Sequence, residues 1–258
     1  MRFTINKNHK FLIILMYYNR PNQLLRALNS IRIQNHTNWH VAFIDDGSEQ
    51  SGEQIVRDFF TAEELEKVTF YNTNDTPEIK KQRAEDYKHL KGSDDKNSGM
   101  WLNPYFNKAV KENKHDIAFF LCDDDVLQEL YLNNLNKYYN ANPDIMYSYC
   151  VVILFDERHH NHLDRTDINS RFLYFHPINP YFHLDTAQVS WRAEAYNKDG
   201  IWFDEEYHLF FDAYWYKRLA EKYGLCVCNM IMGQYKNFDI DAFHKDPEII
   251  EKYKNIKQ

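Results

Sequence analysis

The sequence predicts an α/β protein with a mostly parallel sheet and helices on its faces. The first observation is alternation: strand-like, mostly apolar runs at residues 11–16, 40–44 and 68–71 are separated by segments of helical periodicity. Parallel strands need such crossover helices. The second is that polar residues follow two of these runs directly, where parallel sheets bind their ligands. The third is that 258 residues, 44% of them hydrophobic, suffice to bury a large core.

The elements of the first half follow from local patterns. The run at 11–16 is continuous, as in a strand buried on both faces. Pro21 suits the first turn of a helix, and leucines then recur at helical spacing. Similar patterns predict helices over 53–60, 78–90 and 103–112 and strands over 40–44, 68–71 and 117–121. The polar stretch 72–99, which contains the second of these helices, otherwise predicts a loop, and we expect it to cover a bound donor.

The second half has a helix pattern over 127–139 and a long apolar stretch over 145–155 that favours a strand. Short strands and turns are expected over 170–203. A helix over 211–223 and a strand over 225–232 complete the pattern, and a charged tail follows from 241.

Composition excludes several functional classes. Net charge is −7 without a basic cluster, which disfavours nucleic-acid binding. Only seven glycines are present, which disfavours a glycine-rich phosphate loop. The four cysteines lie in apolar stretches without a CxxC pair, so we expect buried thiols and a reducing, cytoplasmic location. No apolar run reaches the length of a transmembrane helix, which leaves only peripheral membrane association open.

Three consecutive carboxylates, Asp123, Asp124 and Asp125, follow the strand at 117–121. Like charges this close repel unless a positive charge lies near them. Mn²⁺ or Mg²⁺ would supply that charge, since both prefer carboxylate ligands and are shared with substrate phosphates. The alternative is an acidic turn in solvent.

Two more polar segments close strands. Asp45 and Asp46 precede Gly47-Ser48, and their carboxylates can accept hydrogen bonds from a base or a ribose. The alternative is an Asp-Gly turn that caps the next helix. Tyr18, followed by Asn19 and Arg20, can stack on a base, although ordinary packing is the alternative.

Together these motifs resemble family 2 inverting glycosyltransferases. The segment FLIILMYYNRPNQLLRALNSIRIQNHTNWHVAFIDDGS carries the Tyr-Asn pair, the Leu-x-x-Ala-Leu-x-Ser-Ile-x-x-Gln helix and the Asp-Asp-Gly-Ser strand end of that family. Asn107 and Ala109 match its Asn-x-Ala helix, and IAFFLCDDDV stands at its metal-binding acidic motif. The resemblance implies the GT-A fold: a Rossmann-like, mostly parallel central sheet with a smaller mixed acceptor-side half.

The resemblance also implies site residues. Donor-binding residues would be Tyr18, Asn19, Arg20, Asp45, Asp46 and Asp123. The metal would be held by Asp124 in the first place, with Asp125 and Asp123, and His244 is a further candidate. Cys122 departs from the family pattern, which often has an Asp there in its DXD-type motif, so the choice among the three carboxylates stays open.

In the second half, Phe211-Asp212 and Arg218-Leu219 resemble the family's Glu-Asp pair and Arg-Leu. By that match Asp212 would be the catalytic base, while the lost Glu is a departure. The alternative is a helix N-cap. The run His159-His160-Asn161-His162 fits a solvated loop better than a metal site.

These expectations describe one catalytic domain over 1–258. Residues 1–126 would bind the nucleotide-sugar, 127–240 the acceptor, and 241–258 would form the tail. The expected reaction moves a sugar from a nucleotide-diphosphate donor, UDP-linked as is commonest in the family, to a glycan or other hydroxyl-bearing acceptor in glycan biosynthesis. The alternatives are a non-catalytic binding relic of the fold and a sugar-phosphate nucleotidyltransferase.

Overall fold

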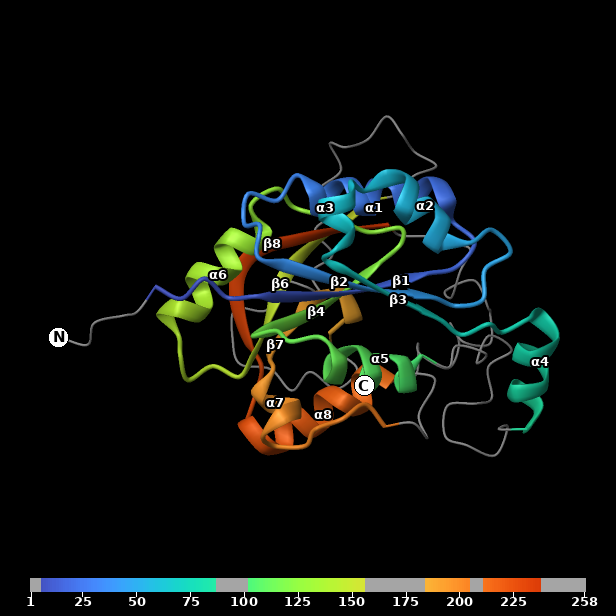
Figure 1. Cartoon of the computed structure of the whole chain (residues 1–258). Coiled ribbons are helices and arrows are strands. Elements are labelled where there is room, and N and C mark those ends of the chain that lie inside the picture. The colour runs from blue at the N-terminus through green and yellow to red at the C-terminus, as the bar shows by residue number, and fades with distance from the viewer. Residues whose placement is uncertain (1–5, 87–101, 156–183, 205–210, 238–258) are drawn as a thin grey trace.

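The computed structural model describes residues 6–86, 102–155, 184–204 and 211–237. These ranges form an eight-stranded sheet in the order β3-β2-β1-β4-β7-β6-β8-β5 (Figure 1). Its strands are β1 Phe11–Tyr17, β2 Trp39–Asp45, β3 Val68–Asn72, β4 Ile117–Cys122, β5 Val126–Leu127, β6 Tyr147–Phe155, β7 Val189–Arg192 and β8 Val227–Asn237.

Helices cover both faces of the sheet. They are α1 Pro21–Arg32, α2 Gly52–Phe59, α3 Ala62–Leu65, α4 Pro77–Asp86, α5 Asn103–Glu112, α6 Tyr131–Ala141, α7 Glu194–Asn197 and α8 Phe211–Tyr223, with a 3₁₀ turn, η3, at Thr186–Gln188. Figure 1 shows α1, α2 and α3 on one side of the sheet and α5, α7 and α8 on the other. None of the helices in the described ranges has the length and apolarity needed to cross a membrane.

The alternation of side chains along β1 divides the core into two layers. Ile13 and Leu15 pack with Leu28 of α1, whereas Leu12 and Ile14 pack with Phe106 of α5. Successive strand residues point to opposite faces, so a strand that is apolar at every position supports a helix layer on each side. The continuous apolar runs in the sequence therefore have a structural cause.

The strands that carry the polar motifs are parallel neighbours. β1 lies between β2 and β4, and β2 pairs in parallel with β3. In this register Met16 lies opposite both Ile44 and Cys122, so the three strands end at one edge. The pairs β4–β7, β6–β7 and β5–β8 are antiparallel. The mostly parallel sheet with a mixed second half is thus confirmed.

Several element boundaries differ from the sequence-based expectations. The helix expected from 127 begins at Tyr131, because Val126 and Leu127 pair with β8 instead. The stretch expected to hold only strands and turns also contains α7. Two of the thiols expected to be buried, Cys122 and Cys228, are only half-buried, and none of the four cysteines forms a disulfide.

Candidate functional site

The first loop of the candidate site joins β1 to the acidic turn after β4. The backbone N–H of Tyr18 donates to Asp123 Oδ2 at 2.8 Å. Arg20 donates to Asp123 Oδ1 at 3.2 Å and to Asp124 Oδ2 at 3.0 Å. The positive charge that the acidic turn requires is therefore supplied in part by Arg20. Burial raises the pKa of the Asp123 carboxyl to about 6, although the Tyr18 N–H and Arg20 act in the opposite direction.

Asp45 holds the loop after β2 in shape. Its Oδ1 accepts a hydrogen bond from the Ser48 N–H and its Oδ2 one from the Gly52 N–H, each at 2.8 Å. Because Gly52 begins α2, the Asp45 carboxylate binds the positive end of that helix. These bonds match the capping alternative for the Asp-Gly turn, and they leave Asp46 as the carboxylate with a free acceptor.

Asp46 is paired with a lysine that the sequence did not single out. The Nζ of Lys80, a residue of α4, lies 2.8 Å from Asp46 Oδ2 and also donates to the Asp46 backbone carbonyl. Asp46 Oδ1 is buried without a hydrogen-bond partner among the described residues. Burial raises the pKa of Asp46 to about 6, even though Lys80 lowers it. The sequence signal for Lys80 was only a charged stretch.

Lys80 also connects Asp46 to Tyr18. Its Nζ lies 3.9 Å from the centroid of the Tyr18 ring, a cation–π distance, and that ring is 44% exposed. Tyr18 is in turn bonded to Asp123 through its backbone. The end of β2 and the acidic turn after β4 therefore belong to one connected site.

Asn19 joins the loop after β1 to the loop after β2. Its N–H donates to Ser48 Oγ at 3.1 Å, and its Oδ1 accepts from the Glu49 N–H at 2.8 Å. Asn19 has a positive φ of 51°, which asparagine tolerates better than most residues. Its observed contacts thus position the loops.

A group suited to a metal ion lies at the end of β4. Ligand atoms of Cys122, Asp124 and Asp125 lie within 4.8 Å of one another. A thiolate with two carboxylates is a donor set that a divalent cation accepts. Asp123, in contrast, turns toward Tyr18 and Arg20. Of the three carboxylates, Asp124 and Asp125 therefore have oxygens close enough to the Cys122 sulfur to share one ion.

Asp212, the candidate base, comes from the other half of the chain. It is the second residue of α8, so the N-cap alternative is wrong, and its Oδ2 accepts a hydrogen bond from Thr186 Oγ1 at 2.7 Å. The neighbouring Phe211 ring lies 5.8 Å from Phe120, two residues before Cys122. His244 and the histidine run at 159–162 lie outside the described residues, as does the part of the expected covering loop from residue 87.

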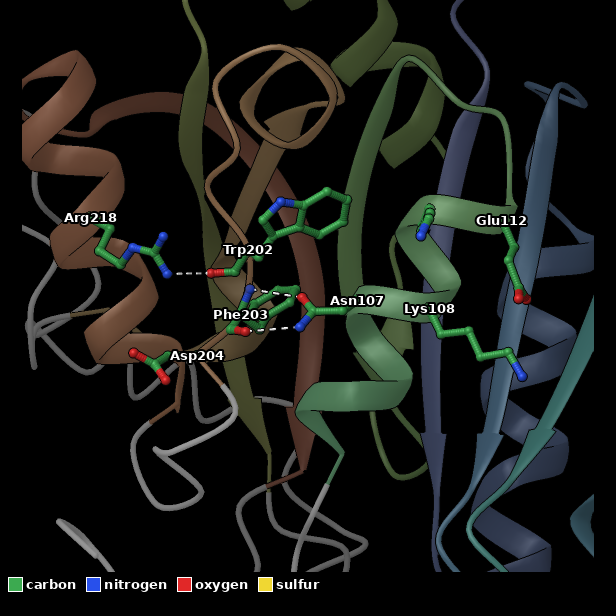
Figure 2. A pocket seen from close by; sticks show the side chains of 8 residues that line it. Asn107, Lys108, Glu112, Trp202, Phe203, Asp204 and Arg218 are labelled. Carbon is green, nitrogen blue, oxygen red and sulfur yellow. Dashed lines mark hydrogen bonds between the residues drawn. The ribbon is translucent and has the colours of Figure 1, made fainter.

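A separate groove of about 760 Å³ lies between α5, the segment 202–204 and α8 (Figure 2). None of the predicted site residues lines it. Asn107, from the family-like Asn-x-Ala motif, bonds the backbone N–H and C=O of Phe203 there at 2.8 and 2.9 Å. Arg218 donates to the Trp202 carbonyl at 2.7 Å. These two motif residues therefore anchor the 202–204 segment.

Comparisons with known proteins agree with the site motifs. Residues 12–76 match the family model described as Glycosyl transferase family 2, which confirms the resemblance over this segment. No curated protein sequence matches the chain significantly.

Solved structures give matches along most of the chain. TarS from S. aureus matches with a TM-score of 0.61 and 14% identity over 90% of this chain and 37% of its own. TarS 1-349 in complex with UDP matches with a TM-score of 0.62 and 16% identity, over 90% of this chain and 61% of its own. The mannosyltransferase PcManGT from Pyrobaculum calidifontis, in complex with GDP-Man and Mn²⁺, matches with a TM-score of 0.57 and 13% identity. This match covers 92% of this chain and 59% of PcManGT. The chain thus has the GT-A fold and spans less than two thirds of each of these proteins.

Proposed function

We propose that the protein is a metal-assisted glycosyltransferase that moves a sugar from a nucleotide-diphosphate donor to an acceptor hydroxyl with inversion. One observation carries the proposal: Tyr18, Asp46 and the acidic turn converge at the ends of three parallel strands and are connected through Lys80 and Arg20. Ligands of open α/β sheets bind at this edge. The family match over residues 12–76 supports the assignment.

Base recognition is assigned to Tyr18 and Asp46. The half-exposed Tyr18 ring offers a stacking face, and Lys80 lies against it. The unpartnered Asp46 Oδ1 accepts an N–H, which the imide of uracil supplies. We therefore propose a UDP-linked donor. When the uracil base stacks on Tyr18, Lys80 moves off the Tyr18 ring or donates a hydrogen bond to a carbonyl of the base.

The diphosphate is assigned to the acidic turn. Asp124 and Asp125 would hold Mn²⁺ or Mg²⁺, which supplies positive charge to the leaving nucleoside diphosphate. Arg20 is a second cation at this point, 3.0 Å from Asp124, and it can bind a phosphate oxygen through its guanidinium.

Asp212 is assigned as the base. Its carboxylate would take the proton from the acceptor hydroxyl as that oxygen attacks the anomeric carbon, on the side opposite the leaving diphosphate. The Thr186 hydroxyl holds one carboxylate oxygen in place at 2.7 Å. A single displacement of this kind inverts the anomeric centre.

A panel of nucleotide-sugars, with and without Mn²⁺, tests the reaction class. Release of free nucleoside diphosphate is expected with Mn²⁺, and Asp124→Ala should abolish it because the variant loses a metal ligand. An exposed α2 carboxylate gives the matched control, Asp58→Asn, which should keep full turnover. Pyrophosphate as the product would indicate a nucleotidyltransferase, and donor binding without any turnover would indicate a non-catalytic relic.

To test Asp212 as the base, the rate of sugar transfer must be measured separately from donor binding. Asp212→Asn should reduce the transfer rate by about 10²-fold or more, since one positioned proton acceptor is lost. Donor affinity, measured by calorimetry with Mn²⁺, should stay within about twofold, because the proposed base acts on the acceptor hydroxyl and not on the donor. A transfer rate equal to that of the original protein would remove Asp212 from this role.

A further inference from the structure

Cys122 differs from the other three cysteines in its surroundings. Its Sγ lies within 4.8 Å of carboxylate oxygens of Asp124 and Asp125, whereas Cys150 and Cys226 are buried in the core. Cys228 is half-buried, but its Sγ faces the Met230 sulfur at 3.8 Å. Among the described residues, the group at Cys122 is the one set of His, Cys, Asp or Glu side chains spaced to share an ion.

The spacing allows one ion to reach all three donors. Thiolate–metal bonds are about 2.3 Å long and carboxylate–metal bonds about 2.0–2.2 Å for zinc, so donors around one ion lie roughly 3–4.5 Å apart. The observed limit of 4.8 Å is close to that range. The three ligand atoms are thus spaced for one ion.

The alternation of side chains along β4 determines on which face of the sheet the Cys122 side chain lies. Phe119 and Leu121 belong to the core layer on the α1 face, and Phe120 belongs to the layer that includes Phe211 of α8. By alternation Cys122 shares the face of Phe120. The thiol therefore lies on the face of the sheet that α8 covers.

We propose that the Cys122 thiolate is a direct ligand of the divalent ion, and that it shifts the site toward thiophilic cations. Thiolates favour zinc-like and cadmium-like ions, whereas all-oxygen sites suit Mg²⁺. The thiol proton leaves to solvent when the metal–sulfur bond forms. The inference rests on the metal site of the proposed function, and it predicts weaker support by Mg²⁺ than an all-carboxylate site would give.

Cd²⁺ titration of the full chain tests the ligand directly, because a cadmium–thiolate bond produces a charge-transfer absorption in the ultraviolet. The original protein should show this band at one equivalent, and Mn²⁺ should compete with it. Cys122→Ser should lose the band and bind Cd²⁺ about tenfold or more weakly, since even losing a residue that only orients a ligand costs about 10–100-fold. Cys228→Ser is the matched control and should keep both.

A second measurement covers the case in which Cys122→Ser does not fold. In the original protein, Mn²⁺ should slow alkylation of Cys122 several-fold, as located by mass spectrometry, without slowing alkylation of Cys228. Cys122→Asp should shift the preference toward Mg²⁺. The inference is overturned if the original protein has no band, if Cys122→Ser keeps it, or if Mn²⁺ leaves Cys122 alkylation unchanged.

The outcome separates from that of the proposed function. A Cd²⁺ band that depends on Cys122, in a protein that releases no nucleoside diphosphate, would refute sugar transfer but leave the thiolate ligand standing. Mn²⁺-dependent turnover without the band would support sugar transfer and refute the thiolate ligand.

Discussion

When no nucleotide-sugar is bound, the charged form of Asp46 destabilises the folded protein. Burial raises the pKa of Asp46 from 3.8 to about 6, with Lys80 acting against this rise. A pKa raised by folding means that the folded state binds the proton more tightly than the unfolded chain. The stability from the protonated form is fully present below about pH 4 and is lost as pH rises through about 6. Above about pH 6 the folded protein bears the full free-energy cost of burying the charged Asp46 carboxylate.

Asp46→Asn removes this cost while keeping the side chain's shape. The rise from 3.8 to about 6 corresponds to about 3 kcal/mol at pH 7. The variant should therefore be more stable than the original protein by up to about 3 kcal/mol at pH 7, but by less than about 1 kcal/mol at pH 4. Lys80 keeps its bond to the Asp46 carbonyl and its contact with the Tyr18 ring.

Urea denaturation at pH 4, 5, 6 and 7 measures the difference in free energy of unfolding. Asp58→Asn, a change at an exposed position of α2, controls for the loss of one negative charge and should show no such trend. A difference for Asp46→Asn that stays constant with pH, or a variant less stable at pH 7, would refute the reasoning. The same variant should lose affinity for the nucleotide, because the amide oxygen of the new side chain faces Lys80 and its NH₂ group then replaces the acceptor at Oδ1.

Two further predictions concern the loops of the site. Gly47→Ala should lower the free energy of unfolding by at least about 1–2 kcal/mol, because φ is +66° and the added Cβ would lie 2.1 Å from the Asp75 carbonyl oxygen. Urea denaturation would show this, and unchanged stability would contradict it. Arg20→Gln should tighten Mn²⁺ binding without donor and weaken nucleoside diphosphate binding, because Arg20 pairs with the carboxylates of the acidic turn. Calorimetry with each ligand alone measures both, and equal shifts in one direction would contradict the assignment.

The sequence alone determined the layers and the edge that carries the site. A strand buried on both faces must be apolar at every position, so β1, β2 and β4 are visible as continuous runs. Polar residues end these runs at the edge of the sheet, where Asp45, Asp46 and Asp123 stay buried through hydrogen bonds to the neighbouring loops and to Lys80. The helices over 103–112 and 211–223 were predicted with the bounds that the structure has, since their apolar positions recur at helical spacing.

Contacts between distant segments set how the polar residues divide their roles. Lys80 pairs with Asp46 across 34 residues of sequence, and Arg20 pairs with Asp124 across 104. Cys122 joins two carboxylates as a possible ligand while Asp123 turns away. Local patterns record where the apolar runs stop. The directions in which side chains then point depend on contacts between distant segments, and those contacts form only when the sheet closes.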